Sequence, residues 1–268
     1  MKIAGKLYTG IIFALLYIPI IVIIVFSFNS SESMAEFSGF SLKWYGELFK
    51  NDKAIDALIN SLILAVSSAL IATVLGTAAA VGIYNIGNKK LKSAIMTVTN
   101  IPMMNPDIVT GVSIMLLFAF GATLLNLRIF GFWTMLIAHV TFNLPYVILC
   151  VMPKLKQMDK NLPEAAMDLG CTPLQAFFKA EIFELLPGIA TGLLMSFTLS
   201  LDDFVISYFV AGESFQTLPI YIYSMTKKRV KPDMNALFAV IFLVIFILLL
   251  ARNLLTKDKN QVKKPVNR

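Results

Sequence analysis

The chain has 268 residues, of which 57% are hydrophobic and only 15% charged, with a formal net charge of +7. Soluble domains contain about 45–50% apolar and about 25% charged residues, so this composition excludes an ordinary soluble protein and indicates an integral membrane protein. The two cysteines, Cys150 and Cys171, form no C-x-x-C motif and give no sign of a disulfide framework, a structural metal or redox chemistry.

Six apolar segments are long enough to cross a bilayer, and they predict an all-α, polytopic membrane protein with six transmembrane helices. The first segment could be mistaken for a signal peptide. It is too long for one and lacks a small-x-small cleavage site, so we interpret it as an uncleaved span. The predicted spans cover approximately residues 8–28, 60–83, 96–120, 132–152, 188–210 and 235–252.

Residues 29–59 form the longest loop on the side opposite the chain termini. Within it, the sequence from Ser41 to Tyr45 predicts the start of a short interfacial helix. Trp44 and Tyr45 are typical of side chains that anchor a protein at the lipid headgroups. A role for Trp44 in receiving a substrate from outside is the alternative interpretation.

The third predicted span carries the first acid expected inside the membrane. Pro102 and Pro106 disrupt helical hydrogen bonding, and broken backbone at membrane depth is tolerated only beside protein or water. Asp107 follows directly. A carboxylate near the bilayer centre costs at least about 2.5–3.5 kcal/mol, so we expect Asp107 to face a cavity, a partner charge or a substrate.

One polar passage interrupts the apolar chain between the fourth and fifth spans. Pro163 suits the first turn of a helix, Glu164 lies favourably at its positive end, and Gly170 can adopt the left-handed conformation that ends it. The Thr-Pro-Leu-Gln sequence at residues 172–175 is typical of a capping box at the start of a second helix. The passage predicts two short helices joined at a glycine, suited to docking on another protein at the membrane surface.

The fifth span contains the adjacent acids Asp202 and Asp203. Asp202 lies fifteen residues after Pro187, where we expect this span to begin, and Asp107 lies fifteen residues after Lys92. At about 1.5 Å per residue, each carboxylate is then roughly 22 Å from the same membrane face. Negative charge shared at one level of a pore favours a cationic substrate.

Asp203 lies about 100° further round the helix than Asp202, which favours contact with a partner subunit. The alternative to a pathway role is that Asp202 or Asp203 caps a kink or pairs with a basic residue of a partner. Apart from Arg252 at the end of the last one, the predicted spans contain no Lys or Arg, so no salt bridge inside the chain is expected.

The basic residues predict the orientation of the chain. Of its 23 Lys and Arg residues, fifteen fall on one side of the predicted spans, although Lys227, Lys228 and Arg229 fall on the other. The positive-inside rule then places both termini and the Glu164 passage in the cytoplasm. The fifteen are Lys2, Lys6, Lys89, Lys90, Lys92, Lys154, Lys156, Lys160, Lys179, Arg252, Lys257, Lys259, Lys263, Lys264 and Arg268.

The Glu164-Ala165-Ala166 sequence, followed at the same interval by Gly170, resembles the EAA loop of the permeases of ABC importers. In that family the loop is a coupling helix that enters a cleft on a cytoplasmic ATPase. The resemblance therefore implies an ATPase-coupling role for Glu164, Ala165, Ala166 and Gly170. The family pattern continues to a proline that would fall at Phe183, and here the chain departs from it.

Three further stretches are similar to the second, C-type permease subunit of spermidine/putrescine ABC importers, and they are residues 105–109, 196–204 and 218–225. This similarity implies a type I permease fold in the bacterial inner membrane, with pathway positions at Trp44, Asp107 and Asp202. We count Asp203 as a fourth candidate. The implied partners are two ATPase copies, a second permease subunit and an extracytoplasmic binding protein.

The resemblance also implies a domain organisation. We expect an N-terminal helix and external loop over 1–57, the permease domain over 58–252, and a basic cytoplasmic tail over 253–268. The implied function is polyamine import driven by ATP. Another small cationic or zwitterionic solute, or a stand-alone secondary transporter built from similar broken helices, are the alternatives.

Sequence motifs that the chain lacks exclude several other classes of protein. The chain has no phosphate-loop motif, so a separate ATPase must supply ATP hydrolysis and the chain itself is not expected to be an enzyme. An intramembrane aspartyl protease would need two facing aspartates, yet no G-x-G-D sequence accompanies Asp107 or Asp202. His139, the single histidine, is most simply a packed residue. No metal, cofactor or nucleic acid is expected.

Overall fold

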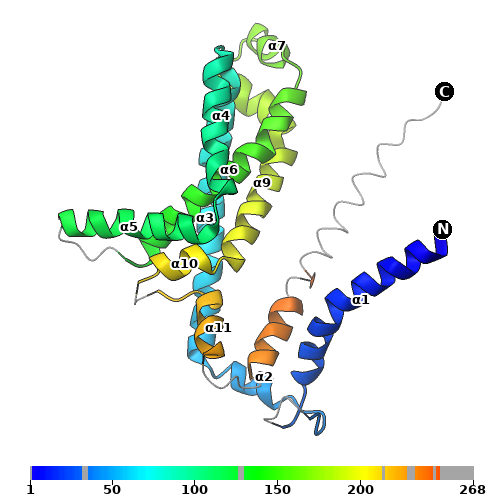
Figure 1. Cartoon of the computed structure of the whole chain (residues 1–268). Coiled ribbons are helices and arrows are strands. Elements are labelled where there is room, and N and C mark those ends of the chain that lie inside the picture. The colour runs from blue at the N-terminus through cyan, green and yellow to red at the C-terminus, as the bar shows by residue number, and fades with distance from the viewer. Residues whose placement is uncertain are drawn as a thin grey trace. The chain divides into compact units, whose positions relative to one another are not determined.

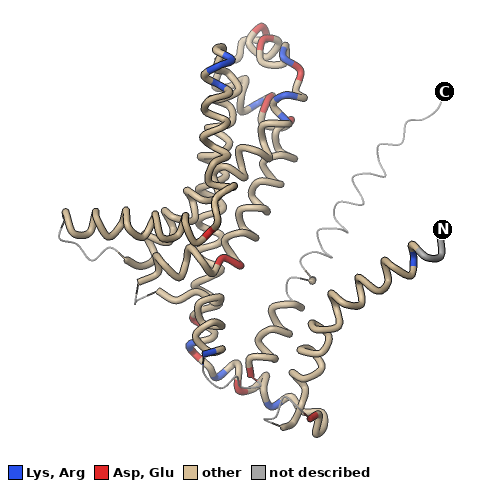
Figure 2. Tube along the Cα trace, in the orientation of Figure 1, with Lys and Arg blue, Asp and Glu red and all other residues tan. Residues whose placement is uncertain are grey.

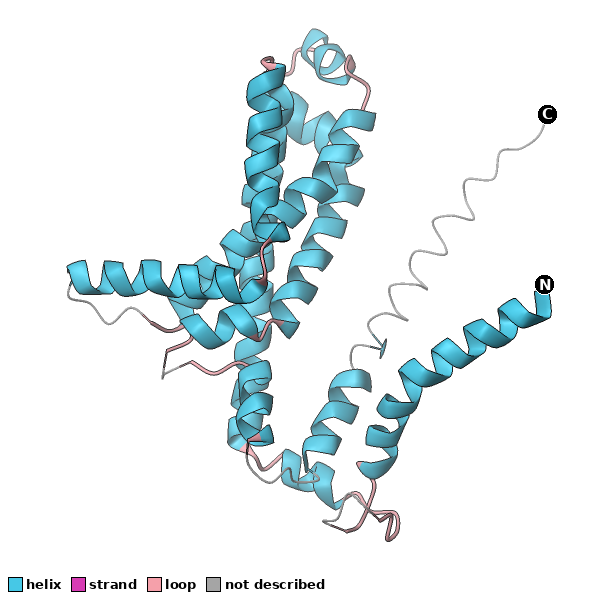
Figure 3. Ribbon diagram, in the orientation of Figure 1, coloured by secondary structure: helices cyan, strands magenta, loops and turns pink. Residues whose placement is uncertain are grey.

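The computed structural model describes residues 2–31, 36–125, 130–212, 215–227, 233–243 and 246–247. Within these ranges the regular secondary structure is helical, apart from one isolated bridge between Asn29 and Phe40, and loops connect the helices (Figures 1 and 3). The helices are α1 (Lys2–Phe26), α2 (Lys43–Leu48), α3 (Asp52–Asn85), α4 (Lys89–Met104), α5 (Asp107–Leu125), α6 (Phe132–Gln157), α7 (Leu162–Asp168), α8 (Pro173–Ala176), α9 (Ile182–Asp202), α10 (Val205–Val210) and α11 (Leu218–Thr226).

The predicted all-α membrane architecture is confirmed. Five helices of the described residues are long and apolar enough to cross a bilayer, and a shorter apolar helix spans Asp233–Leu243 within the sixth predicted span. The rest of that span and the basic tail lie largely outside the described residues, as do Arg128, Lys228, Arg229 and Lys231. The five long helices are Gly5–Phe26, Asp52–Asn85, Asp107–Leu124, Phe132–Gln157 and Pro173–Asp202.

The third predicted span is not one helix. Pro102 lies inside α4 without ending it, and the break falls instead at Asn105, whose backbone is extended with ψ 142°. The cause is local, because a residue before proline is disfavoured in the helical region and Pro106 follows. In Figure 1, α5 turns sharply away from α4 after this break.

The fifth predicted span is wrong at both ends. Its helix begins at Pro173, far before Pro187, and runs through a π-helical segment, Phe177–Glu181, into α9. The second short helix of the polar passage is therefore the first turn of a long one. At the other end, Asp203 is extended with ψ 121°, and α10 starts a new helix only at Val205.

The chain divides into two compact units, residues 56–221 and the pair of segments 1–55 and 222–268. In the unit 56–221, α6 is the central helix, and Met135, Val147, Val151 and Leu155 of this helix are fully buried. Long apolar side chains on one helix require small residues on its neighbours. Both α3 and α9 have small residues where they pack against α6.

A stripe of small residues lets α9 approach α6 closely. Gly188, Gly192, Ser196 and Ser200 recur every four residues on one face of α9, and all four are buried. A Cβ atom at Gly188 would lie 2.9 Å from the backbone oxygen of Cys150. Close backbone approach through small residues is the usual means of packing helices in membranes, where helices gain little from leaving lipid.

Candidate functional site

All three predicted pathway acids lie at the helix breaks, and two of them are exposed. Asp107 is the first residue of α5, Asp202 is the last residue of α9, and both side chains are exposed. Figure 2 shows acidic positions at both breaks, at similar heights and well away from the charged ends of the helices. The shared level was predicted from a fifth span starting near Pro187, whereas its helix starts at Pro173, so the similar height is a finding of the structure.

Each break leaves polar backbone groups beside a carboxylate. Carbonyl groups at the end of a helix have no partner within that helix, so they add partial negative charge near the last residue. Asp202 ends α9 in this way. Among the described residues, no Lys or Arg is paired with Asp107 or Asp202. A mobile cation would therefore meet a carboxylate without a Lys or Arg partner at both points, with added carbonyl charge at Asp202 and the partly positive start of α5 at Asp107.

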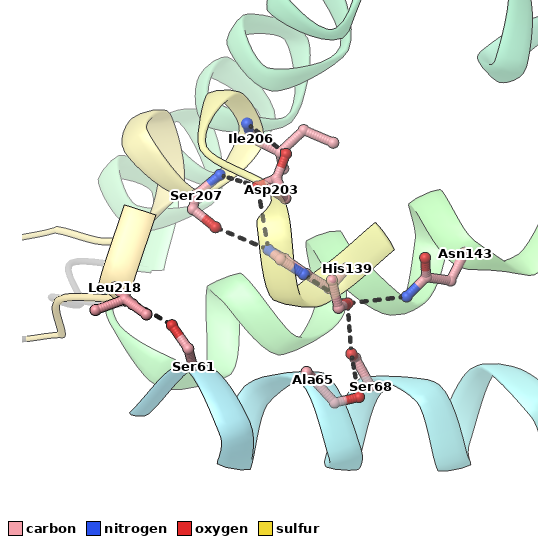
Figure 4. A network of polar contacts seen from close by, with 10 residues as sticks. Ser61, Ala65, Ser68, His139, Asn143, Asp203, Ile206, Ser207 and Leu218 are labelled. Carbon is pink, nitrogen blue, oxygen red and sulfur yellow. Dashed lines mark hydrogen bonds and ion pairs between the residues drawn. The ribbon is translucent and has the colours of Figure 1, made fainter. Parts of the chain in front are cut away.

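Asp203 has a different environment from Asp202. Its side chain is 8% exposed, and its two carboxylate oxygens accept hydrogen bonds from the backbone N–H groups of Ile206 at 3.3 Å and Ser207 at 2.8 Å (Figure 4). These groups belong to the first turn of α10, whose N–H groups have no helical partner. Asp203 therefore caps α10. The expectation that it faces a partner subunit is wrong.

The expectation of no salt bridge considered only Lys and Arg, and in the structure a histidine lies beside Asp203. The Nε2 atom of His139 on α6 lies 3.5 Å from the Oδ2 atom of Asp203. His139 is packed, as expected, with 1% of its surface exposed, but it is packed in a polar environment. Its ring also contacts the hydroxyl groups of Ser200 at 2.8 Å and Ser207 at 3.0 Å.

The site residues that sequence analysis missed are small and polar. Ser68 on α3 lies 2.7 Å from Ser200, and Asn143 on α6 donates a hydrogen bond to the same hydroxyl at 3.0 Å. Both are fully buried. The available signal was their polarity, because a fully buried serine or asparagine inside an apolar helix needs a hydrogen-bonding partner.

Trp44 belongs to the other unit, where it is 3% exposed. Its ring N–H donates to the backbone oxygen of Asn29 at 2.6 Å, so the side chain fastens α2 to the end of α1. Tyr45 beside it lies 2.7 Å from the hydroxyl of Ser27. The headgroup-anchor interpretation of Trp44 is therefore wrong, and its role in receiving substrate stays a prediction.

The local structure of the polar passage is confirmed. Pro163 and Glu164 lie in the first turn of α7, and Gly170 has φ +89°. The N–H of Gly170 donates to Met167 at 2.8 Å and that of Cys171 to Ala166 at 3.1 Å, which is the hydrogen-bond pattern of a Schellman motif.

The capping box that follows is also present. The N–H of Thr172 donates to the side chain of Gln175 at 3.0 Å, and the N–H of Gln175 donates back to the Thr172 hydroxyl at 3.4 Å. Together with the Schellman motif, it defines a rigid turn of fixed geometry. We call residues 162–176 the α7–α8 turn.

The α7–α8 turn exposes apolar side chains together with charge. Leu169 is 87% exposed and Leu174 is 72% exposed, while Glu164, Ala165 and Asp168 are exposed as well. Large apolar side chains beside charged ones at the end of a helix bundle are typical of a protein-binding surface. The turn offers the chemistry that docking on another subunit requires.

The same end of the bundle is basic. Lys92, Lys156 and Lys160 line a hollow of about 540 Å³ between the ends of α3 and α6, and the ammonium group of Lys92 donates to the backbone oxygen of Tyr84 at 2.7 Å. Figure 2 shows lysine positions gathered there near α7. Phosphate groups of lipids suit such a surface.

Within the described ranges, no three His, Cys, Asp or Glu side chains are grouped so as to hold a metal ion. The exposed carboxylates of Asp107 and Asp202 carry negative charge, so the structure supports an electrostatic action for them. They can lower the energy of a cation that passes the breaks, and they can do so only if the cation reaches the exposed carboxylates. Asp203, which already has partners, contributes to the shape of the break.

The chain is similar to known membrane transport proteins. Residues 72–257 match the family described as "Binding-protein-dependent transport system inner membrane component". The spermidine/putrescine transport system permease protein PotC of Escherichia coli K12 is 41% identical over 263 residues, which cover 96% of this chain and 97% of that protein. The putrescine transport system permease protein PotI of the same organism is 39% identical over 226 residues, covering 84% and 80%.

Solved structures with a similar fold are also known. A bacterial ABC transporter involved in the import of the acidic polysaccharide alginate matches with a TM-score of 0.70 at 14% identity, covering 96% of this chain and 95% of the other. An amino acid ABC transporter matches with a TM-score of 0.52 at 20% identity, covering 79% and 97%. At these identities the similarity concerns the fold alone.

Proposed function

The chain belongs to the family of binding-protein-dependent transport system inner membrane components, and from this premise we propose that it is the permease subunit of an ATP-driven importer of polyamines such as spermidine and putrescine. It is a transport component and not itself an enzyme. The polyamine assignment rests on its relatives PotC and PotI, whose names state those substrates.

The observation that carries the proposal is the pair of exposed carboxylates at the two helix breaks, Asp107 and Asp202. A polyamine carries several positive charges spaced along a flexible chain. Negative charge at more than one point therefore matches it better than a single acid. Each carboxylate lowers the cost of taking an ammonium group out of water, and neither holds it so tightly that it cannot leave.

The remaining subunits follow from the same proposal. The α7–α8 turn docks on a cytoplasmic ATPase through Glu164, Ala165, Ala166 and the turn at Gly170. Two ATPase copies serve this chain and a second permease subunit, and an extracytoplasmic binding protein delivers the polyamine. The exposed Leu169 and Leu174 support the docking role, since they would lose contact with water on binding.

The orientation is part of the proposal. With the α7–α8 turn in the cytoplasm, the lysines near it face the cytoplasmic headgroups, in accord with the positive-inside rule. ATP closes the ATPase dimer, the docked turn moves with it, and the pore opens toward the loaded binding protein. Trp44, in the loop on the opposite side, is then on the side from which polyamine arrives.

The test is transport by the complete complex. The chain is reconstituted in liposomes with its ATPase, partner permease and binding protein, and ATP-dependent uptake of labelled spermidine, putrescine and amino acids is measured. We expect uptake of at least one polyamine and none of the amino acids. Uptake of an amino acid instead would contradict the polyamine assignment, and failure of an ATPase to co-purify with the chain would favour a secondary transporter.

A further inference from the structure

A buried polar network joins four helices beside the break between α9 and α10 (Figure 4). It connects α3, α6 and α9 to the first turn of α10 through side chains that lie 57 to 132 residues apart in the chain. Every member is less than a tenth exposed. Its members are Ser68, His139, Asn143, Ser200, Asp203 and Ser207.

The serine side of the network can accept a proton from His139. The hydroxyl of Ser68 lies 3.3 Å from the backbone oxygen of Ala65 and 2.7 Å from Ser200, and either serine can supply the hydrogen of the 2.7 Å contact. Where Ser68 donates to Ala65 and Ser200 donates to Ser68, Ser200 has no hydrogen left for the Nδ1 atom of His139, which lies 2.8 Å away. In that arrangement Nδ1 carries a hydrogen and donates it.

The carboxylate of Asp203 favours a hydrogen on the other ring nitrogen, Nε2. The Nε2 atom of His139 lies 3.5 Å from Oδ2 of Asp203 and 3.0 Å from the Ser207 hydroxyl. A lone pair on Nε2 would face the negative carboxylate, whereas an N–H is attracted to it. With hydrogen on both nitrogens, His139 is an imidazolium ion. The ring then donates to Ser200 through Nδ1 and to Ser207 through Nε2, and its positive charge lies beside the Asp203 carboxylate.

The charge balance leads to the same assignment. An ionised carboxylate as buried as that of Asp203 is costly unless it is paired and hydrogen-bonded. Within the described part of the chain, its only ion-pair partner is His139. The two backbone N–H groups of α10 satisfy hydrogen bonding but carry no full charge.

We propose that His139 is a positioning residue of the translocation pathway: as an imidazolium ion it is the counter-charge of Asp203, and this pair holds the backbone break that leaves the Asp202 carboxylate exposed. The proposal rests on the proposed transport function, in which Asp202 meets the cation. The pair neutralises Asp203 internally. Of the two adjacent acids, only Asp202 then offers its charge to a substrate.

The break depends on Asp203 because its carboxylate replaces the helical partners of α10. Without that cap, the N–H groups of Ile206 and Ser207 would need carbonyls one turn earlier, which favours continuing α9 through the break. Asp202 would then lie within a longer helix and its side chain would change direction. His139 acts on the substrate only through these two acids.

The first experiment reads the protonation of His139 directly. His139 is the single histidine of the chain, so the full chain labelled with ¹⁵N-histidine, purified through a non-histidine tag and placed in lipid nanodiscs, gives one pair of ring nitrogen signals. At neutral pH we expect two signals of the protonated type, and in Asp203→Asn one of them should become the unprotonated type. A neutral ring in the wild-type chain would overturn the proposal, and this result does not depend on any transport assay.

The second experiment separates an ion pair from simple packing. His139→Gln leaves the Asp203 carboxylate buried without its counter-charge, so we expect uptake efficiency to fall roughly tenfold to a hundredfold, as for a buried charged group that loses its partner. The double variant His139→Gln/Asp203→Asn removes both charges and should recover most of that loss. A double variant as impaired as His139→Gln would contradict the ion pair.

The third experiment tests whether His139 acts through Asp202. In the wild-type background His139→Gln should raise the apparent KM for polyamine, whereas in an Asp202→Asn background it should change KM less than about twofold, because the effect is already lost. Equal effects in both backgrounds would overturn the positioning role. Thr141→Val is the matched control, since this α6 hydroxyl is exposed and bonds only its own helix at 2.8 Å.

Chain abundance in the membrane and ATPase co-purification are measured for every variant, so a folding defect is recognised as such. If the wild-type complex transports no polyamine, the proposed function fails, while the nitrogen signals still decide the state of His139. If polyamine is transported and the ring is neutral, the inference fails and the function stands.

Discussion

The acidic residues at the helix breaks differ in whether their charge already has a partner. Asp203 has its carboxylate in a cap and an ion pair, whereas the carboxylates of Asp107 and Asp202 are exposed. Neighbouring acids thus have separate tasks, and Asp203 shapes the backbone from which Asp202 projects. A substitution at each position should therefore have a different consequence.

We expect Asp107→Asn and Asp202→Asn each to lower polyamine uptake by roughly five- to a hundred-fold, which corresponds to the loss of about 1–3 kcal/mol from a hydrogen bond to a charged group. Asparagine keeps the shape of the side chain and removes its charge, so the chain should still insert and bind its ATPase. Initial rates of labelled spermidine uptake by reconstituted complexes measure the effect. Asp56→Asn, an exposed acid near the start of α3, is the control. Wild-type rates in both variants would show that these acids are structural.

Two glycines of α3 differ in how closely other side chains pack against them. A Cβ atom at Gly76 of α3 would lie 2.7 Å from Cβ of Val147 on α6, whereas a Cβ atom at Gly82 of the same helix would meet nothing within 4 Å. Overpacking costs about 1–3 kcal/mol, which exceeds the gain of about 0.5–1 kcal/mol from replacing a helical glycine with alanine.

Gly76→Ala should therefore lower the melting temperature of the purified chain, and Gly82→Ala should leave it unchanged or raise it. Thermal unfolding in detergent, followed by the loss of monodisperse protein, compares the two. Equal melting temperatures for both variants would mean that α3 and α6 can separate at no cost.

At the scale of elements, the rigidity of the α7–α8 turn depends on one backbone angle. Gly170 has φ +89°, and nothing lies within 4 Å of a Cβ atom built there. A bulky side chain has room, so the obstacle to substitution is conformational strain, which costs a non-glycine residue about 1–2 kcal/mol.

Gly170→Val should uncouple transport, reducing both uptake and substrate-stimulated ATP hydrolysis, because the strained residue shifts the geometry of the docked turn. Gly170→Asn should be much milder, since asparagine tolerates the left-handed conformation. ATP hydrolysis with and without loaded binding protein distinguishes uncoupling from loss of the subunit. Normal coupling in Gly170→Val would argue against a docking role for this turn.

Elements differ in how far sequence alone could predict them. The α7–α8 turn was predictable because its Schellman motif and capping box use residues at most five positions apart. The break at Asn105 was signalled by Pro106. The break at Asp203 has no proline or glycine, and the side chain that stabilises it, His139, is 64 positions away in the sequence.

The long helix from Pro173 was missed for a related reason. Pro187 suggested a helix start, but a proline inside a helix is tolerated in membranes when neighbouring groups compensate for its missing N–H. In this chain α9 continues through Pro187 with no break. Hydropathy finds apolar length. It does not reveal where a helix crosses from the bilayer into water.

For the whole molecule, the predicted orientation can be tested with its own cysteines. Cys171 lies in the α7–α8 turn and Cys150 in α6, and both are free thiols. In a Cys150→Ser chain, a membrane-impermeant maleimide should label Cys171 in inverted membrane vesicles and not in intact cells. Bound ATPase should reduce that labelling. Labelling from outside intact cells would reverse the assigned topology.

The helix that begins at the α7–α8 turn ends at the pathway acid. Pro173 to Asp202 form one 30-residue helix, about 45 Å long at 1.5 Å per residue. In the proposed transporter, its first residue lies in the surface that docks on the ATPase, and its last carries the carboxylate that meets the cation. A tilt imposed at one end would be transmitted to the other as by a lever arm, because no loop lies between them. The energy source and the cargo would then be mechanically connected by a single continuous stretch of backbone.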